Sequence, residues 1–309
     1  MSLLLVAANH NLSDWEQQIH NIDPDIDIDL WPAIKDKEQV HFAVCWNQPN
    51  YLLDEFPNLQ AVSSLGAGVD HLLSDESLPD DVKVCRIVSP SLSQQMAEYV
   101  LGAVISIRRN FRQYTQQKEE QMWEILPSPP APEFPIGVMG LGEIGRPVAT
   151  LLAGMGYQVS GWSRSPKDLE GINCFHGDKQ LSAFIKQIQV LVCLLPLTDE
   201  TEGILDLSLF KQLEQPGWLI NVARGNHLVD EDLIYALDRN ILEGAWLDVF
   251  SEEPMPDKHA FWNRPNIMIT PHAASLTQPA EAAEQIVENY KRLLSGLELR
   301  NQVDREQGY

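Results

Sequence analysis

The glycine-rich stretch IGVMGLGEIG at 136–145 constrains the fold of this chain more than any other feature. Gly140, Gly142 and Gly145 have the spacing G-x-G-x-x-G, an apolar run leads into them, and a helical pattern over 144–155 follows. In this context the first glycine permits a tight turn, the second lets a pyrophosphate approach the backbone, and the third lets the helix pack against the strand. The stretch predicts a dinucleotide-binding βαβ unit, and the alternative is a tight turn without a ligand.

The end of the next predicted strand, 157–163, indicates which dinucleotide is bound. An acidic residue here would accept hydrogen bonds from the ribose hydroxyls and repel a 2′-phosphate. The chain instead has Ser163, Arg164 and Ser165, and a guanidinium with two hydroxyls suits a 2′-phosphate better than a neutral diol. We predict that NADP(H) is preferred and NAD(H) possible; the alternative is that Arg164 is a solvated surface residue. The residues predicted to bind the cofactor at these two turns are Gly140, Leu141, Gly142, Glu143, Ile144, Gly145, Ser163, Arg164 and Ser165.

Short apolar runs alternate with helical stretches along the whole chain, which is typical of parallel sheets in α/β proteins. Before the glycine motif, strands are expected at 3–8, 26–31, 42–46, 59–65 and 82–88, and helices at 14–22 and 50–56. From the motif onward, strands are expected at 136–140, 157–163, 190–195, 217–222, 244–250 and 267–270, and helices at 144–155, 181–188, 206–213, 229–240 and 279–297. We therefore predict two α/β domains, each with a doubly wound parallel sheet.

One long amphipathic pattern, residues 91–123, separates these two series, and a proline-rich linker at 127–135 ends it. Its apolar residues recur at three- and four-residue steps and are Met96, Val100, Ala103, Val104, Ile107, Phe111 and Tyr114. We predict a single helix whose apolar stripe is wider than one domain edge needs, and hence a homodimer packed largely through it.

The overall composition narrows the possible partners and cellular setting. With 309 residues the chain is long enough for two domains, and 44 acidic against 22 basic residues give a net charge of −22. This charge argues against nucleic acid and anionic membranes as partners. No apolar run approaches the roughly 18 residues of a membrane span. The four cysteines lack C-x-x-C spacing and the histidines lack metal-ligand spacing, so we expect buried reduced thiols, a cytoplasmic location and no metal.

Three ionisable residues follow predicted strands of the glycine-motif domain. Arg224 comes after LINVA, Glu253 after AWLDVFSE, and His272 after IMITP. An arginine can hold a carboxylate and polarise a carbonyl, and a histidine can protonate the oxygen that hydride addition leaves negative. A glutamate beside the histidine keeps the imidazole protonated and oriented. Each residue taken singly is more typical of a turn or core position, but together at strand ends they indicate a catalytic set.

The motifs GLGEIG, LLPLTDETEGIL, NVARG, LDVFSEEP and TPHAAS, with SLGAGVDHLL upstream, resemble those of the D-isomer-specific 2-hydroxyacid dehydrogenases. The resemblance covers essentially the whole chain, including its terminal NQVDREQGY, and is strongest to the family's bacterial reductases of glyoxylate and hydroxypyruvate. It implies a Rossmann cofactor domain at 100–276 and a flavodoxin-like substrate-binding domain made of 1–99 and 277–309, with the active site in an interdomain cleft.

The resemblance also assigns roles to individual residues. Catalytic positions fall on Arg224, Glu253 and His272. Further cofactor contacts fall on Pro196, Thr198, Val222, Ala223 and Asp248. Substrate binding falls on Trp46, Leu65, Gly66, Ala67, Gly68 and Arg224. From the residues alone, the 65–68 loop is equally a simple glycine turn and Trp46 equally a packed core residue. Gln278 stands where these reductases usually have an arginine, which puts affinity for glyoxylate in doubt.

The resulting expectation is NADPH-dependent reduction of small 2-oxoacids, glyoxylate to glycolate and hydroxypyruvate to D-glycerate. Two alternatives remain open at this point. One is an NAD-linked dehydrogenase of another D-2-hydroxyacid such as D-lactate. The other is a non-catalytic scaffold that senses NAD(P)H, which the presence of Arg224, Glu253 and His272 does not exclude.

Overall fold

The structure is a computed structural model that describes residues 1–7 and 11–308. Ala8, the last residue of the predicted strand 3–8, and Tyr309 of the terminal motif lie outside the described residues. The chain divides into two compact units, one formed by Met1–Ser91 with Leu276–Tyr309 and the other by Leu92–Ser275. The predicted domain boundaries at 99/100 and 276/277 lie eight residues and one residue beyond the observed ones. The substrate- and cofactor-binding roles of the two units stay predictions, as does the interdomain cleft.

The first unit is built on one parallel sheet in the order β2-β1-β3-β4-β5. Its strands are β1 (Ser2–Ala7), β2 (Ile28–Leu30), β3 (Val40–Trp46), β4 (Ala61–Ser64) and β5 (Lys83–Cys85). All residues of β1 are buried, as expected of a central strand covered on both faces. The strand order 2-1-3-4-5 is that of flavodoxin-like sheets, which confirms the predicted class.

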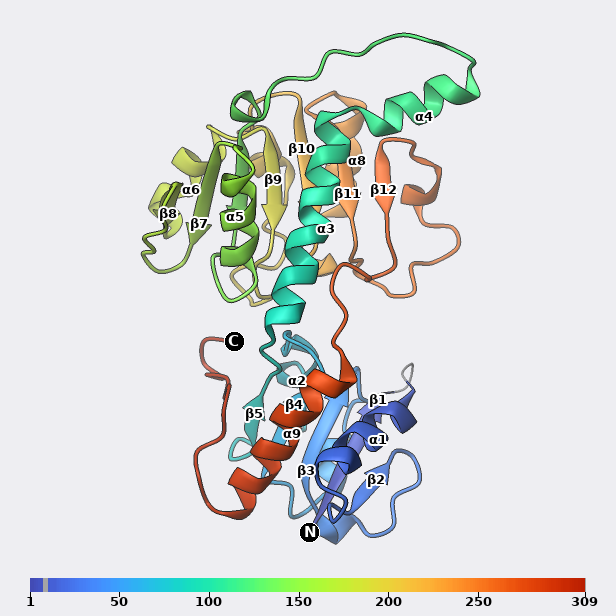
Figure 1. The fold of residues 1–309 in the computed structure, drawn as a ribbon, viewed down its shortest axis with the longest axis vertical. Coiled ribbons are helices and arrows are strands. Elements are labelled where there is room, and N and C mark those ends of the chain that lie inside the picture. Colours follow the sequence, from blue (N-terminus) through green and yellow to red (C-terminus); the bar gives the residue numbers. More distant parts are fainter. Residues whose placement is uncertain (8–10, 309) are drawn as a thin grey trace. The chain divides into compact units, whose positions relative to one another are not determined.

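Helices from both ends of the sequence cover one face of this sheet. Helix α1 (Leu12–Ile22) lies beside α9 (Pro279–Leu294), as Figure 1 shows, and short α2 (Asp70–Leu73) follows β4. Trp15 and Ile19 of α1 and Ile286 and Tyr290 of α9 are buried. The C-terminal helix therefore completes the core of the N-terminal unit.

The second unit contains a seven-stranded parallel sheet in the order β12-β11-β10-β9-β6-β7-β8. Its strands are β6 (Ile136–Met139), β7 (Val159–Ser163), β8 (Ile172–His176), β9 (Val190–Cys193), β10 (Gly217–Asn221), β11 (Leu242–Leu247) and β12 (Ile267–Ile269). The chain builds the sheet outward from β6 in one direction and then from β9 in the other. Ligands of such doubly wound sheets bind at this reversal, beyond the carboxyl ends of the strands.

Alternating residues of the strands face two separate hydrophobic layers. In β9, Val190 and Val192 contribute to one cluster and Leu191 and Cys193 to the other, as the two-residue period of a strand requires. Helices α3 (Pro90–Arg108) and α5 (Gly145–Gly154) pack in the first layer. Helices α6 (Asp178–Ile185), α7 (Leu207–Phe210) and α8 (Asp230–Asp238) pack in the second, on the opposite face (Figure 1). Both faces of the sheet are therefore covered.

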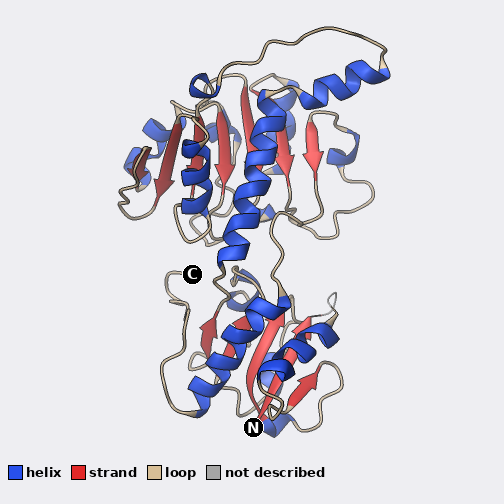
Figure 2. Ribbon diagram, viewed as in Figure 1, coloured by secondary structure: helices blue, strands red, loops and turns tan. Residues whose placement is uncertain are grey.

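The prediction of a single long helix at 91–123 is wrong, because the chain forms two helices there. Helix α3 ends at Arg108, Asn110 adopts a left-handed φ of 58°, and α4 (Phe111–Glu119) starts in a new direction. The apolar stripe is split accordingly. Its α3 part, from Met96 to Ile107, is buried in the core, whereas α4 has no buried residue. A long loop follows α4 and leads to β6 (Figure 2).

Two smaller differences separate the structure from the elements expected from the sequence. The helix predicted at 50–56 is only a 3₁₀ turn, Leu53–Glu55. Strand β8 was not predicted, since it lies at the sheet edge and only its first residue, Ile172, is buried. A strand with so little apolar surface lacks the hydrophobic pattern by which strands are recognised.

Candidate active site

The glycine loop between β6 and α5 has the geometry that close approach of a ligand requires. Gly140 has a φ of 101°, and a Cβ there would lie 2.6 Å from the carbonyl oxygen of Leu194. A Cβ on Gly145 would lie 1.7 Å from the carbonyl oxygen of Gly140, so no side chain fits. Gly142 differs, because a Cβ there would meet nothing within 4 Å and the residue is exposed. The first and third glycines serve the turn itself, and the second leaves room outside it, as a bound pyrophosphate requires.

The loop after β9 borders the glycine loop at the reversal of strand order. Leu194 N donates to Met139 O at 2.8 Å, which holds the start of this loop against the end of β6. Farther along it, Thr198 N donates to Thr201 Oγ1 at 2.9 Å and Thr201 Oγ1 donates to Pro196 O at 2.7 Å. These bonds hold Pro196 and Thr198, both predicted cofactor contacts, in a closed turn near the predicted pyrophosphate position.

The predicted ribose corner follows β7. Ser163 is buried and its hydroxyl donates to Ser165 O at 2.8 Å, so this hydroxyl shapes the turn. Arg164 and Ser165 are exposed. The pKa of Glu200 lies below its ordinary value, mainly because Thr198 Oγ1 donates to it and also because Arg164 is positively charged. The charge of Arg164 thus reaches the loop after β9, on the side where the dinucleotide is expected.

Arg224, Glu253 and His272 follow three strands that are neighbours in the sheet, β10, β11 and β12. The central contact is an ion pair between His272 Nδ1 and Glu253 Oε2 at 2.7 Å, with each side chain 32% exposed. Because the carboxylate accepts from Nδ1–H, proton transfer to a substrate is left to Nε2. The structure therefore brings Glu253 and His272 into contact, with Arg224 close enough for its charge to act on Glu253.

The charge state of Glu253 follows from its surroundings. Burial favours the neutral carboxyl, but hydrogen bonds from His272 and from Phe250 N, with the positive charges of His272 and Arg224, hold its pKa below the ordinary value. Such a carboxyl is ionised at neutral pH and loses its stabilising contacts only as the pH falls through the lowered pKa. The pair therefore combines an ionised carboxylate with an oriented imidazole.

Asp248 holds the backbone that carries His272. Its side chain is almost fully buried and accepts hydrogen bonds from Ala273 N at 2.8 Å and Ala274 N at 2.9 Å. Its carbonyl accepts from His272 N at 2.8 Å. His272 itself has a φ of 52°, a left-handed conformation that costs a non-glycine residue on the order of 1–3 kcal/mol. Asp248, predicted to contact the cofactor, thus also fixes the turn that aims His272.

Tyr99 and Thr270 extend this network and were not found from the sequence. Thr270 Oγ1 donates to Asp248 Oδ1 at 2.5 Å, Tyr99 forms a short hydrogen bond to Thr270 Oγ1, and Trp246 Nε1 donates to the Tyr99 hydroxyl at 2.7 Å. Burial raises the pKa of Tyr99, so its hydroxyl stays a donor. Tyr99 lies on α3, so no spacing in the sequence could associate it with His272.

Apart from Arg224, the predicted substrate-binding residues lie in the other unit, where Trp46 ends β3 and the loop 65–68 follows β4. Trp46 packs on the loop, since a Cβ on Gly66 would lie 2.9 Å from its ring. Its ring also contacts that of His71, with the ring centroids 4.9 Å apart and the planes tilted by 56°. Gly66 N donates to Ser64 Oγ at 3.1 Å. Within residues 1–7 and 11–308, no hydrogen-bond partner of the N–H groups of Ala67 and Gly68 is found.

Leu65 and Gln278 are the last two positions that bear on substrate binding. Leu65 is buried, and Gln278, which stands in the place of the expected arginine, is exposed at the start of α9.

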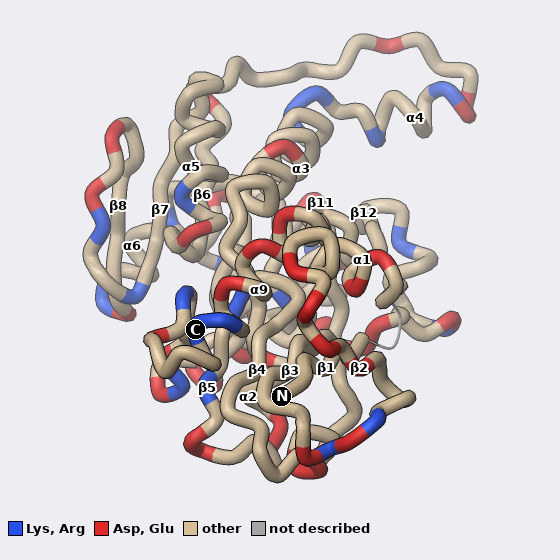
Figure 3. The backbone as a smooth tube through the Cα atoms, turned by 60° about the horizontal axis from the view of Figure 1, so that its bottom comes forward, with Lys and Arg blue, Asp and Glu red and all other residues tan. Residues whose placement is uncertain are grey.

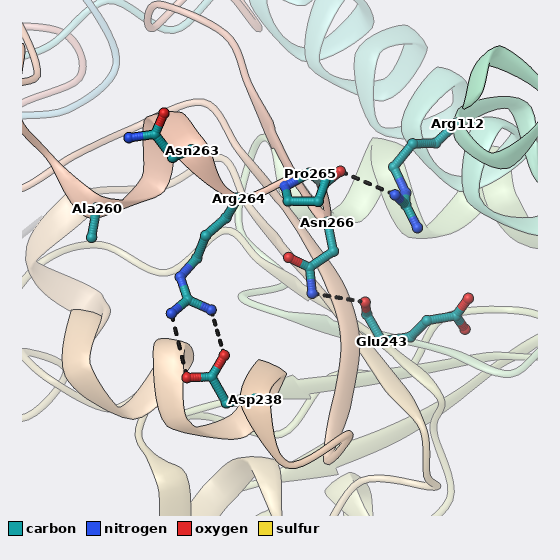
Figure 4. Close-up of a pocket in the computed structure, with 8 residues that line it drawn as sticks. All are labelled: Arg112, Asp238, Glu243, Ala260, Asn263, Arg264, Pro265 and Asn266. Atoms are coloured by element: carbon teal, nitrogen blue, oxygen red, sulfur yellow. Dashed lines mark hydrogen bonds and ion pairs between the residues drawn. The ribbon is translucent and has the colours of Figure 1, made fainter. Parts of the chain in front are cut away.

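An open depression of about 640 Å³ lies at the amino ends of the strands of the second sheet, where β11 and β12 begin (Figure 4). Two of its charged groups pair with one another, since Arg264 forms two bonds to Asp238, at 2.7 and 3.3 Å. Arg112 instead donates to the backbone oxygen of Pro265 at 3.1 Å. It contains no histidine and lies away from the carboxyl ends of the strands, so it is not the predicted active site. No group of three or more potential metal ligands occurs in the described part of the chain.

Comparison with known proteins identifies the family. Residues 101–274 match the model of the NAD-binding domain of D-isomer specific 2-hydroxyacid dehydrogenases. The chain belongs to this family. The resemblance inferred from the sequence motifs is thereby confirmed.

Other members of the family match this chain over its full length. A glyoxylate/hydroxypyruvate reductase A of Yersinia enterocolitica is 37% identical, with all of both chains covered. The crystal structure of a family member from Xanthobacter autotrophicus Py2, in complex with NADPH and MES, matches with a TM-score of 0.95 and 38% identity over 100% of this chain and 99% of that one. An NADPH-dependent glyoxylate/hydroxypyruvate reductase from Sinorhizobium meliloti, in complex with NADP and sulfate, matches with a TM-score of 0.93 and 33% identity over the whole of both chains.

Proposed function

We propose that this family member uses NADPH to reduce small 2-oxoacids, glyoxylate to glycolate and hydroxypyruvate to D-glycerate. The observation that carries the proposal is the 2.7 Å pair of His272 with Glu253, in the same unit as Arg224 and the glycine loop. The names of the full-length relatives, and the NADPH and NADP in two similar structures, support both substrate class and cofactor.

The residues of the chain divide the chemistry between them. When bound, the nicotinamide supplies a hydride to the carbonyl carbon of the oxoacid. His272, oriented through Nδ1 by Glu253, gives its Nε2 proton to the carbonyl oxygen as that oxygen gains charge. Arg224 binds the carboxylate and polarises the carbonyl. One oxoacid, one hydride and one proton therefore give one 2-hydroxyacid.

A local positive group is needed because the protein is strongly acidic overall. Acidic residues outnumber basic ones by 44 to 22, and Figure 3 shows them on both units. An anionic oxoacid must therefore be captured against a repelling field. We propose Arg224 for this capture. In the other unit, the backbone N–H groups of Ala67 and Gly68 also suit a carboxylate.

The proposed activity is tested by following NADPH consumption with glyoxylate and with hydroxypyruvate. Steady turnover with both supports the proposal. An NAD-linked D-lactate dehydrogenase would instead oxidise D-lactate with NAD and reduce glyoxylate poorly. A sensing scaffold would bind NADPH without turning over any 2-oxoacid.

We expect Glu253→Gln to shift the pH dependence of reduction. Reduction needs a protonated imidazole, so activity falls as the pH rises, and the carboxylate of Glu253 stabilises the protonated form. Loss of this charge-assisted hydrogen bond should move the alkaline limb of the kcat profile to lower pH. The neighbouring exposed residue provides the control, because Glu252→Gln should leave the limb in place. Coincident limbs for wild type and Glu253→Gln would show that another group stabilises the acid.

Cofactor preference should depend on Arg164. We propose that its guanidinium binds the 2′-phosphate, so wild-type kcat/KM should be higher with NADPH than with NADH. Arg164→Ala should reduce this ratio by about 10- to 150-fold, as expected for a lost hydrogen bond to a charged group. Lys186→Ala, which removes an exposed positive charge at the end of α6, should not change it. Equal kcat/KM values for both cofactors in the wild type contradict the assignment.

We further propose a homodimer, whose interface involves only the C-terminal part of the segment 91–123 expected from the sequence, together with the start of the following loop. The stripe on α3 is core, but the segment Phe111–Ile125 exposes large apolar side chains: Phe111 is 52% exposed, Trp123 98% and Ile125 93%. Such a cluster is typical of a surface that another chain covers. In a symmetric dimer the same segment of both copies would lie in the interface, so these residues would be buried in each copy.

The dimer prediction is tested by mass in solution. Trp123→Ser with Ile125→Ser should raise the dimer dissociation constant by a factor on the order of 10³, since each copy loses an anchor. Met155→Ser, at an exposed apolar residue elsewhere on the same unit, should leave it unchanged. A monomeric mass of the wild type by light scattering at micromolar concentration would contradict the proposal.

The state of the cysteines supports a reducing compartment, and we propose the cytoplasm. All four are free thiols, and burial raises the pKa of Cys85 and Cys193 to about 12, which keeps them protonated. None of the helices in the described part of the chain is long and apolar enough to cross a membrane.

A further inference from the structure

His227 is a fully buried histidine, three residues after Arg224, to which neither the sequence motifs nor the mechanism above assign a role. Its ring lies between two loops. Nδ1 is 3.2 Å from both Arg224 N and Arg224 O, and Nε2 is 3.2 Å from Pro196 O. One side chain therefore contacts the backbone of the proposed oxoacid-binding arginine and the backbone of the predicted cofactor loop.

The two partners determine where the ring carries its proton. A carbonyl oxygen can only accept, so Nε2 must donate its hydrogen to Pro196 O. Arg224 N–H is a donor, so Nδ1 must accept from it. The neutral ring with its proton on Nε2 makes both of these bonds. Arg224 O also lies 3.2 Å from Nδ1, but that oxygen already accepts from Asn221 Nδ2 and from His227 N.

The other contacts of Arg224 show that its backbone is held from several sides. Asn221 Nδ2 donates to Arg224 O at 2.9 Å and His227 N donates to it at 3.3 Å, so the carbonyl is satisfied without the imidazole ring. Gly225 packs against the backbone of Phe250, where a Cβ would lie 1.8 Å from the carbonyl carbon. The N–H of Arg224 is the remaining backbone group, and His227 accepts from it.

We propose that His227 is a positioning residue that fixes Arg224 for the oxoacid and Pro196 for the dinucleotide at the same time. The side chain acts through two hydrogen bonds of opposite direction, one to each loop. This positioning role rests on the proposed function, in which Arg224 binds the oxoacid and Pro196 borders the cofactor. The link makes the arginine and the cofactor loop a single rigid part of the site.

Backbone contacts between the same two loops make variants of His227 testable. Gly203 N donates to Asn226 O at 2.9 Å and Leu205 N donates to His227 O at 2.8 Å, and neither bond needs the ring. The loops therefore stay joined when the side chain is replaced.

Two amide substitutions separate the two hydrogen bonds. In His227→Asn the side-chain oxygen can take the place of Nδ1, whereas in His227→Gln the side-chain nitrogen can take the place of Nε2. His227→Leu removes both groups at similar volume. His259→Asn is the matched control, because His259 pairs with Asp230 on the same unit and has no proposed role in the site.

The experiment measures oxoacid kcat/KM and, without oxoacid, the Kd for NADPH. His227→Gln should lower kcat/KM for glyoxylate, and His227→Asn should raise the NADPH Kd, each by about 5- to 150-fold, the range for a buried group left unpaired. His227→Leu should do both, and His259→Asn neither. A purely structural role would lower the melting temperature of all three variants while both constants changed alike or not at all, and that result would overturn the proposal.

Amide hydrogen exchange tests the same bond without any activity. Exchange of the peptide containing Arg224 should be faster in His227→Gln and His227→Leu than in the wild type, and unchanged in His227→Asn. If the wild type reduces no 2-oxoacid, the proposed function fails, while this exchange pattern still decides whether His227 holds Arg224. Equal exchange in all variants would overturn the proposal even in an active enzyme.

Discussion

Replacement of His272 by alanine is expected to lower kcat for 2-oxoacid reduction by about 10²–10⁴-fold, the range for a lost general acid. The imidazole is oriented by Glu253 at 2.7 Å, and no second side chain in the proposed mechanism carries the proton. The Kd for NADPH should change little, because the glycine loop and Arg164 stay in place. Stopped-flow measurement of a single turnover separates the chemical step from product release.

The unusual backbone of His272 makes a second variant necessary. Its φ of 52° is tolerated better by asparagine than by alanine, so His272→Asn keeps the turn and still removes the proton donor. Both variants should lose kcat to a similar extent, whereas His259→Asn should not. If His272→Asn retained kcat within a few-fold while His272→Ala lost it, the residue would act through the turn and not through its proton.

Replacement of Arg224 by alanine is expected to lower kcat/KM for glyoxylate by a factor on the order of 10²–10⁴, which corresponds to two hydrogen bonds to a charged group. The larger part should be an increase in KM, since the residue binds the carboxylate, with a smaller loss of kcat from weaker polarisation of the carbonyl. The backbone should stay in place, because Asn221 and His227 hold it through main-chain atoms.

Two further measurements test the role of the planar guanidinium group of Arg224. Arg224→Lys retains the charge without the bidentate geometry and should be intermediate. Added guanidinium should restore part of the activity of Arg224→Ala. Arg239→Ala, at a residue that lies over the ring of Tyr235 on the same unit, should behave as the wild type. An unchanged glyoxylate KM in Arg224→Ala would assign carboxylate binding to other groups, such as the loop at Ala67 and Gly68.

The features that could be predicted from the sequence are those set by local constraints. Gly140 needs a positive φ, and Gly145 has no room for a Cβ, so both appear as glycines at a fixed spacing whatever the rest of the chain does. Strand–helix alternation implies parallel sheets, and parallel strands end at the same edge. Arg224, Glu253 and His272 could be recognised for this reason as a set, with Glu253 expected beside His272, although the geometry of their contacts could not.

Contacts between distant segments were decided only by the tertiary structure. The pairing of His272 with Glu253 depends on β11 and β12 being neighbours, which periodicity does not reveal. Tyr99 reaches Thr270 from a helix on the sheet face, and His227 reaches Pro196 across two loops. A buried tyrosine or histidine looks the same in sequence whether it fills the core or positions a catalytic group.

The segment 91–123 shows most clearly where the sequence alone is insufficient. Its apolar period is the same for a helix that packs on its own sheet and for one that packs on another chain, because both bury one face. The sequence by itself determined the glycine loop, the two parallel-sheet units and the strand-end residues. Only the tertiary structure decided that α3 belongs to the core and that α4 and Trp123 stay exposed, since burial depends on which surfaces the rest of the chain brings against each face.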